Sequence, residues 1–157
     1  MSDAAMIGNA PFRWEHKDAV YEFAATDLEV ELMFQSLHEA WARARLEATK
    51  GRIGEEAWTM DHARHVENVS ANQFAMGGRL SMMFLFTTAG FAEYATLKWQ
   101  KQVAGKGPQT NKVNVPFLHA LAKNNAADFE SLRTGMLRHD FPNLFAPVEG
   151  ATKPTGA

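Results

Sequence analysis

The stretch WTMDHARHVENVSANQFAM, residues 58–76, has the longest regular amphipathic pattern in the chain. Its larger side chains recur at intervals of three and four, which places them on one side of an α-helix. They are Trp58, His62, His65, Val66, Val69, Gln73 and Met76. Charged residues and asparagines lie mostly between them, as in a helix with one face in a core and the other in water. The pattern predicts that this helix is central to the fold.

Length and composition indicate one domain. The chain has 157 residues, and a chain near 150 residues buries roughly 70% of its unfolded surface. The formal net charge of −2 gives no broad positive field, which argues against nucleic acid as the main ligand. The absence of cysteine excludes disulfides and thiolate metal sites. No apolar run approaches the ~20 residues of a membrane span, and no export signal is visible, so we expect a soluble protein without membrane contact.

A β-hairpin is predicted near the N-terminus. Aromatic and charged residues alternate before a polar turn at residues 17–18, and strand-favouring residues follow it. Because a two-stranded hairpin is marginal in water, its aromatic face must pack on the helices or on another subunit. We expect partner contacts from four of its side chains: Phe12, Trp14, Tyr21 and Phe23.

The rest of the chain predicts about five helices. A capping box at Thr26–Glu29 begins a helix that runs from Asp27 to Thr49. The apolar side of that helix is expected to consist of Leu28, Leu32, Leu37, Trp41 and Ala44, widened by Met33, Phe34 and Leu46. Further helices are expected over residues 54–76, 80–86, 90–103 and 114–139, the last capped by Asn114 and interrupted near Asn124.

The predicted fold is therefore mainly α, a single compact domain with an N-terminal β-hairpin and extended termini. Residues 1–10 lack periodicity and are interpreted as a flexible arm. Residues 11–145 form the helical domain. Residues 146–157 contain glycines and prolines but almost no large side chains, which predicts an extended tail with nothing to bury.

Two histidines are the candidates for a metal site. His62 and His65 are three residues apart and could face one ion, with Asp61 or Glu67 beside them and His38 on the preceding helix. The His-Glu-x-x-His pattern is absent, and histidines on an apolar helix face are commonly core or interface residues. We therefore predict no catalytic residue, no metal and no cofactor, and keep the three histidines as the basis of an alternative, a small metal-dependent enzyme.

Four lysines surround the loop at residues 104–111. The loop has the glycine, lysine and threonine of a phosphate-binding loop in the wrong order, and no strand precedes it. Lysines gathered in one region favour an acidic partner surface, although a solvated loop explains them as well. The predicted partner contacts here are Lys98, Lys101, Lys106 and Lys112.

The order of these features resembles a family of phage proteins. An aromatic hairpin leads into a leucine-rich helix, a second helix ends at Phe74–Gly78, and Thr87–Gly90 opens another after an apolar stretch. This order is similar to small proteins from the head and tail assembly modules of tailed bacteriophages, including tail-assembly-chaperone-like chains. The resemblance spans residues 12 to about 141, and the C-terminal tail lies outside it.

The resemblance implies a non-enzymatic role in particle assembly. We expect a multi-copy minor structural component of the virion that forms homo-oligomers, contacts capsid, neck or tail proteins, and occupies the host cytoplasm during assembly. The alternative within the same family is a tail-assembly chaperone that is absent from the mature particle. Detecting the polypeptide in purified virions distinguishes the two.

Overall fold

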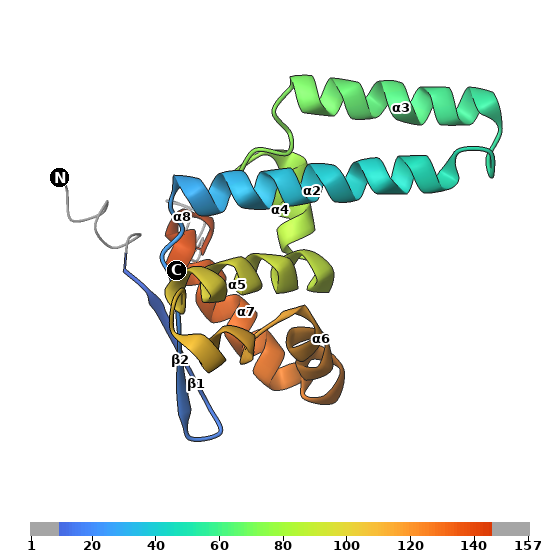
Figure 1. Cartoon of the computed structure of the whole chain (residues 1–157). Coiled ribbons are helices and arrows are strands. Elements are labelled where there is room, and N and C mark those ends of the chain that lie inside the picture. Colours follow the sequence, from blue (N-terminus) through green and yellow to red (C-terminus); the bar gives the residue numbers. More distant parts are fainter. Residues whose placement is uncertain (1–9, 146–157) are drawn as a thin grey trace, which may run out of the picture.

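The computed structural model describes residues 10–145. Among them, helix α5 (Thr88–Gln102) is the most buried element. It packs against α2, α4, α6 and the second strand of the hairpin, so its neighbours surround it (Figure 1). Side chains from almost every turn of α5 are buried, among them Phe91, Tyr94 and Trp99. The sequence predicted this helix but assigned the central position to residues 58–76.

A glycine allows α5 to approach α4 (Arg79–Leu85) closely. A Cβ atom on Gly90 would lie 1.8 Å from the backbone oxygen of Phe84, a distance that no packed structure tolerates. Thr87 begins α5, because its hydroxyl accepts a hydrogen bond from the Gly90 amide at 2.9 Å. The short apolar helix α4 is thereby held against the core, with Phe84 and Leu85 buried.

The predicted hairpin is confirmed. Strands β1 (Phe12–His16) and β2 (Ala19–Phe23) pair antiparallel, with Trp14 opposite Tyr21. The two residues between the strands both have positive φ angles, as a tight two-residue hairpin turn requires. Strand β1 packs on α7 and β2 packs on α5, so the aromatic face of the hairpin meets helices of the same chain.

Helix α2 (Leu28–Thr49) is confirmed, but its cap and its buried face differ from the prediction. The N-cap is Asp27, whose carboxylate accepts a hydrogen bond from the amide of Val30 at 3.0 Å. The Thr26 side chain is turned inward to a buried polar network instead. The side chains that α2 buries are Val30, Phe34 and His38, whereas Leu28, Leu32 and Trp41 are exposed.

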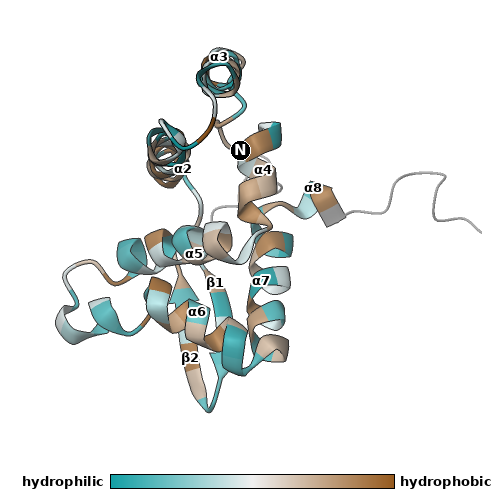
Figure 2. Cartoon of the chain, turned by 90° about the vertical axis from the view of Figure 1, so that its right-hand side faces the viewer, coloured by the Kyte–Doolittle hydropathy of each residue, from teal (hydrophilic) through white to brown (hydrophobic). Residues whose placement is uncertain are grey.

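The prediction that residues 58–76 form the central helix is wrong. Helix α3 (Glu55–Ser70) ends earlier, because the chain turns at Asn72, which has a φ of 56°. α3 has no buried residue and packs mainly on α2, so it is the helix farthest from α5 (Figure 2). The indole nitrogen of Trp58 donates to the carbonyl oxygen of Leu46 at 2.8 Å and fixes α3 to α2.

The second half of α2 and the whole of α3 form a helical hairpin, residues 38–70, which we call the arm. It projects beyond the end of α5, and its two helices run antiparallel (Figure 1). The reversal occurs at Gly51, which has a φ of 82°, a conformation suited to glycine. The amphipathic pattern at residues 58–76 is therefore that of a peripheral helix.

The remaining helices close the body of the molecule. The loop at residues 104–111 contains the short 3₁₀ helix η1 (Gly107–Asn111). The predicted helix at residues 114–139 is two helices, α6 (Val115–Asn124) and α7 (Ala126–Asp140), and α8 (Pro142–Phe145) follows them. Asn114 and Asn125 cap α6 and α7, each accepting a backbone amide at the first turn.

The mainly helical fold with an N-terminal β-hairpin is thus confirmed for residues 10–145. Within these residues, no helix combines the length and the apolar character needed to cross a membrane. Two predicted segments lie outside the described residues: the flexible N-terminal segment, of which only residue 10 is described, and the tail at residues 146–157.

Candidate functional site

A groove of about 460 Å³ lies between α2 and α3 in the arm. Its volume is within the range of binding pockets, roughly 300–1,000 Å³. Phe74 and Leu80, which follow α3 in the chain, complete its lining. The polar and aromatic side chains that α2 and α3 contribute to the lining are His38, Trp41, Arg45, Thr49, Asp61, Arg64, His65 and Asn68.

His38 forms part of the apolar wall of the groove. Its ring stacks on Phe84 with centroids 4.2 Å apart and meets Phe74 edge-on at 4.8 Å. The residue is only 5% exposed, and its Nδ1 atom has no hydrogen-bond partner. Burial lowers the pKa of His38 to about 4, because the apolar surroundings disfavour the charged ring. His38 is therefore neutral at pH 7.

The three candidate metal ligands are not brought together as a set. His65 packs edge-on against Phe74 with centroids 5.5 Å apart, and like His38 it lines the groove. His62 instead stacks on Trp58 at 5.2 Å and does not line the groove. Among residues 10–145, no group of three or more histidine, aspartate or glutamate side chains has the arrangement of a metal site.

The charge in the groove is carried mainly by arginines. Arg45 lies over the ring of Trp41, with its guanidinium carbon 4.9 Å from the centroid, and Arg64 faces it from α3. Asp61 is the one carboxylate in the lining. Apolar surface between cationic side chains suits a segment of protein in which acidic residues flank apolar ones.

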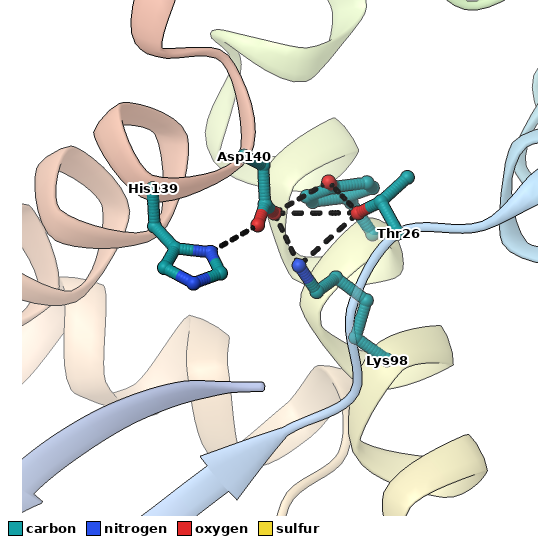
Figure 3. A network of polar contacts seen from close by, with 5 residues as sticks. Thr26, Lys98, His139 and Asp140 are labelled. Carbon is teal, nitrogen blue, oxygen red and sulfur yellow. Dashed lines mark hydrogen bonds and ion pairs between the residues drawn. The ribbon is translucent and has the colours of Figure 1, made fainter. Parts of the chain in front are cut away.

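A second cluster of polar side chains lies inside the body (Figure 3). Lys98 of α5 forms an ion pair with Asp140 of α7, and its ammonium group also donates to the hydroxyl of Thr26 at 3.1 Å. The hydroxyl of Tyr94 donates to the same carboxylate at 2.6 Å, and His139 Nδ1 lies 2.8 Å from its other oxygen. These contacts join the segment before α2 to α5 and α7.

Burial dominates the electrostatics of this cluster. The side chains of Lys98 and Asp140 are both 0% exposed. Burial lowers the pKa of Lys98, and the neighbouring carboxylate of Asp140 opposes that shift. Burial also raises the pKa of Tyr94 well above its ordinary value. The ion pair has no exposed surface that a substrate could contact. We therefore interpret the cluster as structural: it holds α5, α7 and the segment before α2 together.

The aromatic residues predicted to bind a partner are covered by the chain itself. Trp14, Tyr21 and Phe23 are buried, and Phe12 is half-buried against the core. The rings of Tyr21 and Phe23 both pack on Trp99 of α5, at 5.9 and 5.6 Å between centroids. This face of the hairpin is not available to a partner, so the prediction is corrected.

The predicted lysine cluster is also divided. Lys98 is fully buried and cannot contact a partner, which corrects the prediction for that residue. Lys101 pairs with the N-cap carboxylate of Asp27, and this hydrogen bond raises the pKa of Lys101. Lys112 lies over the ring of Tyr21 at 4.8 Å, and Lys106 is exposed.

Sequence reasoning missed both the groove and the buried cluster. The one sign of the groove in the sequence is that His38 on one predicted helix could lie near His65 on the next, and both line it. In the buried cluster His139 and Asp140 are adjacent, but Lys98, Tyr94 and Thr26 bond to partners 42 or more residues away along the chain, so no spacing connects them.

Comparisons with protein-family models, with curated proteins and with solved structures found no match for this chain.

Proposed function

We propose that this chain is a non-enzymatic assembly protein that acts by binding protein partners through its arm. One observation carries the proposal: α3 has no buried residue, although apolar side chains occur along it. Met60 is 59% exposed and Val66 is 49% exposed. Val66 and Val69, both exposed, are three residues apart on a side of α3 that does not line the groove, and contiguous exposed apolar surface is typical of protein contact sites.

The resemblance supplies the setting of the proposal. We place the chain in the head and tail assembly of a tailed bacteriophage, as a minor component present in several copies. The packing of α2 supports this role, because α4 and α5 hold its first part and Lys98 bonds to Thr26 just before it, while its other end projects (Figure 1). An interaction surface on a rigid support loses little conformational entropy when it binds.

The open groove also favours a second candidate, a tail-assembly chaperone. A chaperone of this kind would hold a segment of a tail protein in the groove and leave before the particle is complete. Antibody detection of the chain in purified particles separates the two functions. A stoichiometric signal supports the structural component, and detection only in infected-cell extracts supports the chaperone.

The metal-dependent enzyme would require metal binding by the histidines. His38 and His65 both contact Phe74, whereas His62 stacks on Trp58. Elemental analysis of the purified chain tests this alternative. Stoichiometric zinc or iron that is lost in a His65→Ala variant would support an enzyme in place of our proposal.

The decisive experiment adds negative charge to the surface of the arm and leaves the buried core unchanged. Met60→Glu with Val66→Glu places two carboxylates on α3, where both side chains are exposed, so folding should be retained. In cells that produce the particle, we expect this variant to reduce the yield of complete particles at least tenfold. Val20→Glu is the matched control, because Val20 is equally exposed but lies on the hairpin. Normal particle yield with the arm variant would refute the proposal.

A further inference from the structure

The described residues contain a surface that matches the groove in the arm. It is the N-terminal half of α2, residues 28–39, on which Leu28 is 67% exposed and Leu32 is 52% exposed. The two leucines are four residues apart and therefore lie on one side of the helix. α3 covers only the later part of α2, so this side is open to solvent (Figure 1).

The charge on this surface is complementary to that of the groove. Residues 28–39 contain Glu29, Glu31 and Glu39 but no lysine or arginine. The groove presents Arg45 and Arg64, with Asp61 as the opposing charge. An acidic helix with exposed leucines thus fits a groove that has an apolar floor and two cationic side chains.

Within one chain the two surfaces cannot meet. Both are built on α2, a single continuous helix of 22 residues, so its first half cannot fold back onto the groove beside its second half. They can meet only between copies.

We propose that the arm groove of one copy binds residues 28–39 of α2 in a second copy. The contact joins two different surfaces and is therefore heterologous, and repetition produces a ring if the rotation closes and a filament if it does not. The inference rests on the proposed function, because it identifies the partner that the arm binds.

Charge reversal on each surface gives a matched test. Arg45→Glu with Arg64→Glu makes the groove acidic, and Glu31→Arg with Glu39→Arg makes the helix basic; Glu29 is left unchanged because it pairs with Lys101 of the same chain. Each double variant places like charges in every contact. We expect wild-type chain to form a defined oligomer in light scattering coupled to size exclusion, and each variant to weaken that association at least tenfold. Circular dichroism confirms that the variants keep their helices.

Mixing the two variants distinguishes a specific contact from general damage. In a mixture, the acidic groove meets the basic helix, and the unchanged groove meets the unchanged helix. We expect the mixture to recover assemblies of wild-type size, with the two variants alternating. Failure of the mixture to assemble, when both variants are folded, would overturn the proposed contact.

Cysteine cross-linking provides a measurement that does not depend on charge. The chain contains no cysteine, so Leu32→Cys with Asp61→Cys introduces one on each surface. Mild oxidation should give a ladder of covalent oligomers, whereas Val20→Cys with Asp61→Cys should give monomer. Wild-type chain that is monomeric at its highest soluble concentration would overturn this inference and leave the proposed function, with a different partner, to the particle-yield test.

Discussion

The pH dependence of stability tests the environment of His38. In the folded chain burial lowers the pKa of His38 to about 4, whereas an unfolded histidine has a pKa near 6.5. Between these values the unfolded chain binds a proton that the folded chain does not bind. The stability that the folded chain owes to a neutral His38 is therefore fully present above pH 6.5, and it is lost as the pH falls toward 4.

The size of this effect follows from the two pKa values. Between pH 7 and pH 4.5, protonation of His38 in the unfolded chain should reduce the free energy of unfolding by about 2–3 kcal/mol. Replacing His38 by Phe removes the titrating group and preserves an aromatic ring against Phe84 and Phe74. The variant should lose that much less stability over the same range of pH.

Urea denaturation at pH 4.5, 5.5, 6.5 and 7.5, followed by far-ultraviolet circular dichroism, measures the difference. His119→Gln is the matched control, because it removes a histidine that is exposed on α6. Parallel pH profiles for wild-type chain and His38→Phe would show that His38 titrates normally, and our account of a buried, neutral ring would be wrong.

Two further substitutions test the interior of the body. Asp140→Asn leaves the buried ammonium group of Lys98 without its counter-ion and should cost about 3–5 kcal/mol, a fall of roughly 6–20 °C in Tm by calorimetry. Lys98→Met should cost less, because the carboxylate of Asp140 keeps other hydrogen-bond donors; equal losses would contradict this. Gly90→Ala should cost roughly 3 kcal/mol or more by urea denaturation, because the added methyl group meets the Phe84 backbone, whereas Gly54→Ala, which meets no atom within 4 Å, should cost under about 1 kcal/mol.

Local patterns predicted the elements well but not their places in the fold. The hairpin, the caps at Thr87 and Asn114 and the break at Asn125 depend on neighbouring residues, and all are present. Burial depends on what surrounds an element. α5 is enclosed on most sides, so its apolar residues are spread around the helix and its faces differ little in polarity. A helix with one clearly apolar and one clearly polar face lies at the boundary with water, as α3 does.

Pairing between polar residues far apart in the chain could not be predicted either, because it too depends on what surrounds each residue in the fold. Lysine is almost never fully buried unless it is paired, so the spacing of Lys98 and Lys101 suggested a solvated cluster. The structure separates the two: one side chain points to Asp140 in the core and the other to Asp27 at the surface. Only the fold brings Asp140 to Lys98, and only that contact makes burial of the lysine tolerable.

The misplaced helix has a physical origin in what periodicity can show. Periodicity shows that a helix has an apolar face, but it does not show what covers that face. In the single chain, Val66 and Val69 of α3 remain exposed, and their spacing of three places them on one side of the helix. Neither side chain lines the groove, so a partner that covers them contacts a different side of α3. The amphipathic pattern at residues 58–76 therefore marks a face that the fold of one copy leaves exposed, and the helix lies at the edge of the molecule for that reason.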